Sequence, residues 1–169
     1  EGDTLDILHT IKSNYGYLSV EGGFALDEYY SCCSTLVQSN LGPNDGRKIS
    51  HGQSIYFIRN GSELTSCVDM DPSSSLDNTI RVVRGPQMNY FMLKVIKDFF
   101  SKPFTISNMT SRMGVRIEGN TIHSIVSHNI ASEGIVKGSI QVPGNGKPII
   151  LMADHPSIGG YPKIATVIL

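Results

Sequence analysis

Asp154 is the residue that the sequence places best for proton transfer. It follows the almost wholly apolar run 147–153, which is typical of a strand covered on both faces, and it precedes a Gly-rich polar loop. A carboxylate at this point would be partly desolvated, which would raise its pKa towards values useful in acid–base chemistry. The pattern is equally consistent with a carboxylate that caps the following turn.

The Gly-rich loop adds groups that could stabilise negative charge. Lys163 could offer positive charge to an oxyanion, with a solvated lysine at a strand end as the alternative. The backbone N–H groups of Gly159 and Gly160 could form a nest for an oxyanion or a carboxylate, although Gly-Gly also marks plain turns. Tyr161 belongs to the same loop, and His155 is interpreted as a surface residue. These positions predict a small-molecule site at the end of a buried strand.

Two glutamines and a basic–acidic run supply groups for recognising an amide or a carboxylate. Gln87 and Gln141 stand close to prolines, and each can donate and accept hydrogen bonds towards a urea-like or lactam group. Arg112, Arg116 and Glu118 lie in one short run, and on a strand Arg116 and Glu118 would share one face. A guanidinium beside a carboxylate could hold a carboxylated or amide substrate bidentately. The alternative is an exposed ion pair of little energetic weight.

Composition and charge argue against several other classes of site. The formal net charge is −1 and no basic run is longer than Arg47-Lys48, so we expect no nucleic-acid groove. The apolar runs are too short to span a membrane. The 3 cysteines include the adjacent Cys32 and Cys33, and they lack both zinc-site spacing and a neighbouring histidine. We therefore expect no disulfide framework, no metal site and a reduced, cytoplasmic setting.

Many short predicted strands and one predicted helix position these residues. The helix has an apolar face from Met88 to Phe99, and Pro103 bars its extension. We expect this face to pack in the core, with a groove for a partner as the alternative. The predicted strands cover 5–8, 15–20, 54–58, 79–83, 104–107, 115–118, 121–127, 139–142, 147–153 and 164–169. This pattern predicts an all-β fold, mainly β with one helix, as a barrel or a sandwich.

The segment 69–78, rich in Ser, Asp and Pro, is the best candidate for a boundary between two lobes. We predict a first, partial lobe over 1–72 and a second lobe over 73–169. The alternative is one continuous domain, which the chain length of 169 residues also permits.

Several motifs, taken together and in order, carry a family resemblance. They are Leu18–Gly23, Arg84-Gly-Pro-Gln87, Ser111-Arg-Met-Gly-Val-Arg-Ile-Glu-Gly119, Gln141-Val-Pro, Ala153-Asp154 and Gly159-Gly-Tyr-Pro-Lys-Ile-Ala165. With them the chain resembles the C-subunit proteins of 5-oxoprolinase, also known as allophanate hydrolase subunit 2 or biotin-dependent carboxyltransferase-like proteins. This family includes the carboxyltransferase region of urea carboxylase and KipA, an anti-inhibitor that acts on a sporulation-kinase inhibitor. Its members are longer than this chain, so we expect a fragment that lacks an N-terminal part and a C-terminal tail.

The resemblance implies a cyclophilin-like β-barrel lobe with part of a second lobe. It also implies a C-subunit-like component of an ATP-dependent 5-oxoprolinase-type complex that binds and opens a small cyclic amide. Arg112 and Glu118 would orient the substrate, Gly159 and Gly160 would stabilise developing negative charge, and Asp154 would move protons. Expected partners are a B-subunit-like (KipI-like) protein and, as a further candidate, an A-subunit-like protein. The complex would use ATP, for which this chain has no phosphate loop.

Two alternatives follow from the same resemblance. One is transfer of a carboxyl group from carboxybiotin to a urea-like amide. The biotin would then arrive on another domain, because this chain has no biotin-accepting lysine motif. The other is a non-catalytic regulatory partner that docks a KipI-like inhibitor. Three departures from the family pattern bear on the choice, namely Cys33 in place of arginine, Ser111 in place of Asn or Asp, and Pro156-Ser-Ile158 in place of a Gln-Thr-Thr-type run.

Overall fold

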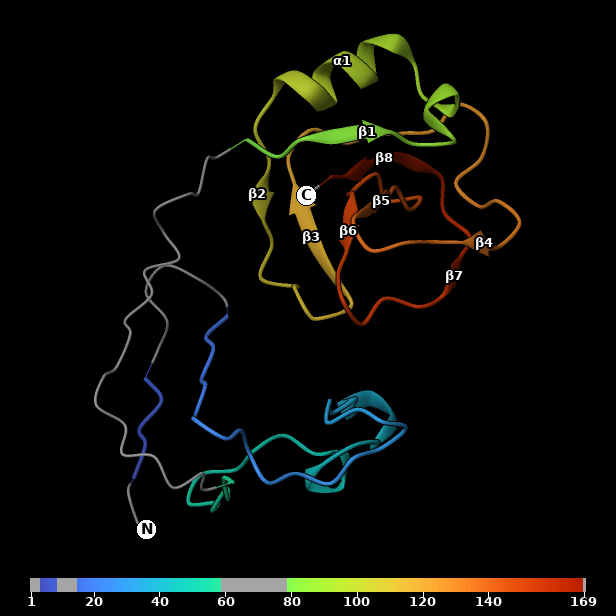
Figure 1. The fold of residues 1–169 in the computed structure, drawn as a ribbon. Coiled ribbons are helices and arrows are strands. Elements are labelled where there is room, and N and C mark those ends of the chain that lie inside the picture. The colour runs from blue at the N-terminus through green and yellow to red at the C-terminus, as the bar shows by residue number, and fades with distance from the viewer. Residues whose placement is uncertain (1–3, 9–14, 59–78, 169) are drawn as a thin grey trace. The chain divides into compact units, whose positions relative to one another are not determined.

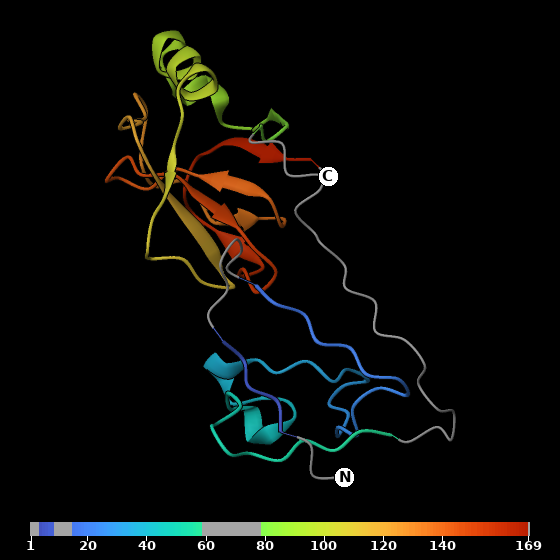
Figure 2. The ribbon, with the colours of Figure 1, turned by 90° about the vertical axis from the view of Figure 1, so that its left-hand side faces the viewer.

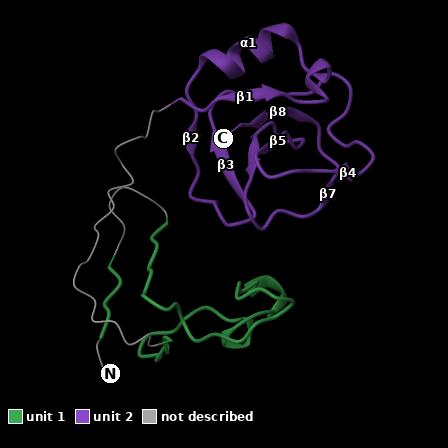
Figure 3. Ribbon diagram, viewed as in Figure 1, with its two compact units in different colours: residues 1–76 green, residues 77–169 purple. Residues whose placement is uncertain are grey.

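The computed structural model describes residues 4–8, 15–58 and 79–168. The chain divides into two compact units, residues 1–76 and residues 77–169 (Figure 3). The segment 69–78, for which the sequence predicts the lobe boundary, lies outside the described residues, and so does the predicted division between 72 and 73.

The described part of the second unit is an antiparallel sheet with one α-helix, α1 (Leu93–Ser101). In spatial order the six strands are β1 (Val82–Arg84), β8 (Lys163–Val167), β5 (Ser139–Gln141), β6 (Ile149–Leu151), β3 (Gly114–Glu118) and β2 (Thr105–Ile106) (Figure 1). A separate two-stranded sheet joins β4 (Glu133–Gly134) to β7 (Ile158–Gly159). This architecture confirms the prediction of a mainly β fold with one helix.

The six-stranded sheet ends in two edge strands among the described residues. β1 pairs with β8, and β2 pairs with β3, but β1 and β2 are not paired with each other. A closed barrel would need that last pairing. Closure of the cyclophilin-like barrel therefore stays a prediction.

Most predicted strands of the second unit overlap observed ones, and one does not. The strand predicted over 121–127 is wrong, because this segment contributes only an isolated bridge between Ser124 and Phe91. Ile122 is almost wholly buried, whereas Ile125 and Val126 are exposed, so the apolar residues of this segment do not form one face. The sequence pattern does not predict the short strands β4 and β7.

The helix begins later than its apolar pattern predicts. Residues Met88–Tyr90 form a 3-10 turn, η4, and Phe91 is extended because it bridges to Ser124. The helix then starts at Leu93 and lies on one side of the sheet in both views (Figures 1 and 2). Val95, Ile96 and Phe99 pack against the core, which confirms the predicted core face for these residues, whereas Met92 of the same predicted face is exposed.

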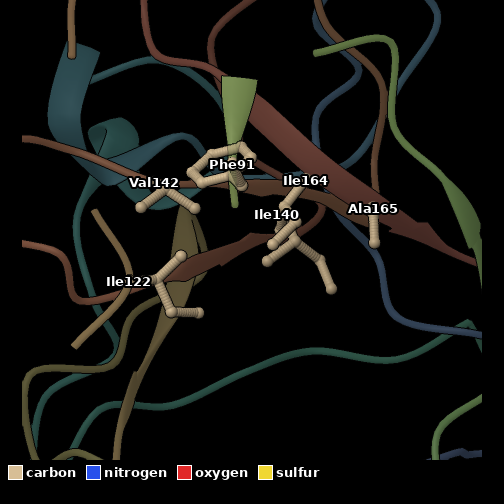
Figure 4. Close-up of a cluster of buried hydrophobic side chains, with 6 residues drawn as sticks. All are labelled: Phe91, Ile122, Ile140, Val142, Ile164 and Ala165. Carbon is tan, nitrogen blue, oxygen red and sulfur yellow. The ribbon is translucent and has the colours of Figure 1, made fainter. Parts of the chain in front are cut away.

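The core of the second unit lies between α1, η4 and the central strands. Its buried cluster comprises Phe91, Ile122, Ile140, Val142, Ile164 and Ala165 (Figure 4). Ile140 belongs to β5, and Ile164 and Ala165 belong to β8, so these two strands are anchored by side chains with 2% exposure or less. Full burial of each isoleucine contributes roughly 2–3 kcal/mol to the stability of the fold. Polar residues carried by β5 and β8 are therefore held on a rigid support.

The described residues of the first unit form turns, two short 3-10 helices and isolated bridges. The helices are η1 (Val37–Ser39) and η2 (Asn44–Gly46). Gly42 and Gly46 both have positive φ, and a Cβ on either would overlap the backbone of a neighbouring turn, so both positions require glycine.

The three strands predicted in the first unit, over 5–8, 15–20 and 54–58, are wrong. Their side chains are exposed except for the half-buried Val20, and the only described pairing is the isolated bridge from Phe57 to Phe24. Without an apolar face to bury, such short segments do not form a stable sheet.

Candidate functional site

Arg116 and Gln141 lie in one row across three neighbouring strands. Arg116 of β3 is opposite Ile149 of β6, and Ile149 is opposite Gln141 of β5. Directly opposed residues of an antiparallel sheet project from the same face. Gly114 and Leu151, which also oppose each other, extend this face by one further row. The opposite face carries Ile140 and Ile150, which are opposed to each other and pack in or against the core.

A hollow of about 220 Å³ lies over the face that carries Arg116 and Gln141. Its floor is formed by β3, β5 and β6, and its rim by the segment 109–113 and by Pro156. The lining residues are Met109, Ser111, Met113, Gly114, Arg116, Gln141, Ile149, Leu151 and Pro156. Its volume is smaller than that of a typical drug-sized site and fits a small ligand.

The two segments of the rim are joined by an ion pair between Arg112 and Asp154. Arg112 Nε donates to Asp154 Oδ2 at 2.7 Å, and a terminal guanidinium nitrogen donates to Oδ1 at 3.0 Å. The backbone N–H of Asp154 also donates to the carbonyl oxygen of Arg112 at 2.9 Å. A turn closed between Ser111 N and Gly114 O, 3.0 Å apart, aims the arginine towards this partner. We call this pair the rim clasp.

The rim clasp lowers the pKa of Asp154. The hydrogen bonds from Arg112 favour the ionised carboxylate, and they outweigh the partial burial that would raise the pKa. The expectation of a raised pKa is therefore wrong, because the sequence does not reveal the arginine partner. An ionised carboxylate held bidentately is a poor proton donor at neutral pH, so the geometry favours a role in holding the rim.

Lys163 is buried and belongs to a second polar cluster with Glu133 and Gln87. Its Nζ donates to Glu133 Oε1, which also accepts from Gln87 Nε2 at 2.7 Å. The backbone N–H of Lys163 donates to Gln87 Oε1 at 3.1 Å. Lys163 is 4% exposed, which contradicts the alternative of a solvated lysine. The hydrogen bonds from Lys163, and then from Gln87, lower the pKa of Glu133.

Glu133 is a site residue that the sequence reasoning misses. It stands in the short strand β4, which carries no recognisable pattern, and nothing near it in sequence marks it as a partner of Lys163. The usable signal would have been Lys163 itself, because a lysine inside an apolar strand is rarely buried without a carboxylate.

Glu118 lies away from the rim clasp. It is bound by Lys147, whose Nζ lies 2.9 Å from Glu118 Oε1 in an ion pair that is about half exposed, and this contact lowers the pKa of Glu118. Arg112 belongs to the turn that precedes β3 and Glu118 ends the strand, about 13 Å further along at the rise of an extended strand. The structure therefore does not bring these two predicted substrate-binding residues together.

Gly159 and Gly160 do not form the predicted nest. Gly159 lies in β7 opposite Glu133, in a pleated strand whose successive N–H groups point in opposite directions, and neither glycine has positive φ. Gly160 instead accepts a hydrogen bond from the N–H of Ile130 at 2.8 Å. Tyr161 is 39% exposed beside them.

Gly159 leaves room for the side chain of Gln141. A Cβ on Gly159 would overlap Gln141 Nε2 and would lie 3.0 Å from Ile135 Cδ1. Gln141 is only 5% exposed, and its Nε2 has no hydrogen-bond partner among the described residues. A buried donor without a partner costs roughly 1–3 kcal/mol.

A broader hollow, of about 570 Å³, lies between the end of β1, η4 and α1. None of the predicted site residues lines it, and its lining is mostly apolar. We place the candidate site in the smaller hollow because polar groups converge there on a rigid sheet. Within the described segments, no helix has the length and apolar character that crossing a membrane requires, and no cluster of three or more His, Cys, Asp or Glu residues could hold a metal ion.

Comparisons with known proteins agree with this fold. The chain matches the family "Carboxyltransferase domain, subdomain A and B" over residues 1–169. It is 36% identical to the C subunit of 5-oxoprolinase from Haemophilus influenzae, over 99% of this chain and 53% of that protein. It is 31% identical to the C subunit of 5-oxoprolinase from Escherichia coli, over 90% of this chain and 49% of that protein. The chain thus spans about half the length of these curated relatives.

A solved structure of a carboxylase has a similar fold. The crystal structure of Kluyveromyces lactis urea carboxylase superimposes with a TM-score of 0.74 and 25% identity, over 88% of this chain and 15% of that chain.

Proposed function

Because the chain belongs to the carboxyltransferase domain, subdomain A and B, family, we propose that it acts as a C-subunit-like component of an ATP-dependent 5-oxoprolinase-type complex. In this complex it binds a small cyclic amide and takes part in opening the ring. The partners are a B-subunit-like protein and an A-subunit-like protein, and the ATP chemistry lies with them. The similarity to the C subunits of two 5-oxoprolinases supports this assignment.

The observation that carries the proposal is the pairing of a guanidinium and a buried amide in one small hollow. Arg116 can bind a carboxylate, and Gln141 can bond an amide carbonyl. Ile149 and Leu151 offer an apolar floor to the ring between them. A lactam that carries a carboxylate has a matching group for each: a carboxylate for Arg116, an amide carbonyl for Gln141 and an apolar ring for Ile149 and Leu151.

The remaining polar residues have supporting roles in this proposal. The rim clasp of Arg112 and Asp154 holds the two rim segments over the ligand. Lys163 lies opposite Gln141 across β8 and β5, and its bond to Glu133 fixes that side of the sheet. Direct stabilisation of an oxyanion by Lys163 would require this ion pair to open.

Carboxyl transfer to a urea-like amide is the second candidate. The similarity in fold to urea carboxylase favours it. Biotin would be supplied by another domain, and a urea-like amide would contact Gln141 in the same hollow.

Reconstitution of the complex separates these functions. The chain is co-expressed with the A and B subunits of a 5-oxoprolinase, and conversion of 5-oxoproline to glutamate is measured with and without ATP. Turnover that requires ATP and this chain is the expected result, with Arg116→Gln as a variant that should lose it. Carboxylation of urea by carboxybiotin in place of this activity would support the second candidate. A stable complex that turns over no lactam and no urea would refute both and favour a regulatory partner.

A further inference from the structure

We infer that Arg116 is the specificity-determining residue of the hollow and that it selects amides that carry a carboxylate over neutral, urea-like amides. This inference rests on the proposed function, in which the hollow takes a small amide. It assigns a role to a residue that is distinct from the rim clasp and from the Lys163 cluster.

The first argument is the charge of the hollow. Among the described residues that line it, Arg116 is the only ionisable one. The neighbouring basic residues already have carboxylate partners, because Arg112 binds Asp154 and Lys163 binds Glu133. A neutral ligand would leave the positive charge of Arg116 without a counter-charge in a partly desolvated place, whereas a carboxylate would compensate it.

The second argument is that no carboxylate of the described residues pairs with Arg116. Glu118 lies two residues further on the same face of β3, but Lys147 binds it at 2.9 Å. Within the described segments no ion pair and no side-chain hydrogen bond involves the guanidinium of Arg116. Because Arg116 is partly buried, its charge is less well solvated than that of a surface arginine.

The third argument is the spacing of Arg116 and Gln141. Two strand separations lie between them, so their Cα atoms are about 10 Å apart with Ile149 in the middle. Both side chains project from the same face, so a small ring that rests on Ile149 can be contacted from both sides. In this arrangement the carboxylate faces Arg116, and the amide of the ring faces Gln141, which also lines the hollow.

Binding to the full chain tests the inference directly. Isothermal titration calorimetry at neutral pH would compare 5-oxoproline with 2-pyrrolidinone, which has the same lactam ring without the carboxylate, and with urea and acetate. We expect 5-oxoproline to bind at least about tenfold more tightly than each of the other three, because a charge-assisted hydrogen bond is about twice as strong as a neutral one. Acetate that binds as tightly as 5-oxoproline would overturn the inference by making the hollow a general anion site.

Variants then test whether Arg116 causes the preference for 5-oxoproline over 2-pyrrolidinone. Arg116→Gln should bring 5-oxoproline and 2-pyrrolidinone to within about threefold of each other, and Arg116→Lys should keep part of the preference. Arg81→Gln removes the same charge from an exposed position outside the hollow and should keep the full preference. An unchanged preference in Arg116→Gln would overturn the inference.

The failure of the inference can be told apart from the failure of the proposed function. Equal binding of 5-oxoproline and 2-pyrrolidinone to the unmodified chain would refute the role of Arg116 but keep the amide site. Binding of neither lactam would refute the amide site itself, and the inference with it.

Discussion

The rim clasp should stabilise the protein at neutral pH and lose this effect in acid. Replacing Asp154 by Asn keeps the shape of the side chain but removes the charge that Arg112 binds bidentately. We therefore expect Asp154→Asn to lower the free energy of unfolding at pH 7. The same substitution should have a small effect at a pH at which Asp154 is already protonated.

The magnitude follows from the exposure of the two partners. The side chain of Asp154 is 21% exposed and that of Arg112 is 62% exposed, so water screens much of the attraction. Exposed ion pairs contribute roughly 0.2–1 kcal/mol, and bidentate geometry places this pair near the top of that range. We expect a loss of about 1 kcal/mol.

The direction of the pH dependence follows from the lowered pKa of Asp154 in the folded chain. A carboxyl group whose folded pKa lies below its unfolded value stabilises the fold at every pH above the unfolded pKa. That contribution declines as the pH falls below the ordinary value of 3.8 and is lost below the folded pKa. The difference between the parent chain and Asp154→Asn should therefore shrink on acidification.

Urea unfolding followed by far-UV circular dichroism measures this effect. Arg112→Gln and the double variant complete a double-mutant cycle, which isolates the coupling between the two side chains from other effects of each substitution. We expect a coupling of about 0.5–1 kcal/mol at pH 7 that falls towards zero as the pH is lowered from 3.8 through the folded pKa of Asp154. A coupling near zero at pH 7, or one that stays the same size throughout this acid titration, would refute the assignment of the rim clasp.

Two further predictions concern the support of Gln141 and of Lys163. Gly159→Ala should displace the amide of Gln141 and destabilise the chain by roughly 1–3 kcal/mol. The control Gly134→Ala lies on the paired strand with open space around it and should change stability far less. Equal effects of the two substitutions in urea unfolding would contradict this reasoning. Glu133→Ala should lower the free energy of unfolding because it leaves the buried Lys163 without its carboxylate partner. Lys163→Met should lower it less, because Glu133 is 43% exposed and can be solvated. The reverse order in urea unfolding would show that Lys163 is not held as a buried charge.

The sequence predicts the sheet of the second unit well because its strands are anchored by buried apolar residues. Ile140, Ile150 and Ile164 all lie in predicted strands, and all three belong to the core or pack against it. Where apolar residues are scattered over both faces, as in 121–127, the same reasoning fails. In the first unit the apolar runs 5–8 and 54–58 are exposed, so β-propensity alone does not produce strands.

The sequence predicts the parts of the candidate site but not the contacts between them. It singles out Asp154 and Arg112 separately, but the local sequence around Asp154 cannot show that an arginine 42 residues away binds it and lowers its pKa. It assigns Lys163 to a site loop, but the burial of Lys163 depends on Glu133, which contacts it from another sheet. The charge state of each group is set by a partner that only tertiary pairing supplies.

A register shift explains why Lys163 lies opposite Gln141. Ile140 is opposite Ala165, so a regular ladder would place Gln141 opposite the core residue Ile164. The register shifts between Ile140 and Gln141, and Gln141 instead lies opposite Lys163. Bulges of this kind re-aim side chains and are frequent beside active sites. The extra residue is Ile164 of β8, so the bulge lets β8 place the adjacent Ile164 and Ala165 in the core and still bring Lys163 opposite Gln141. On β5 the ordinary alternation of side chains already places Ile140 and Gln141 on opposite faces.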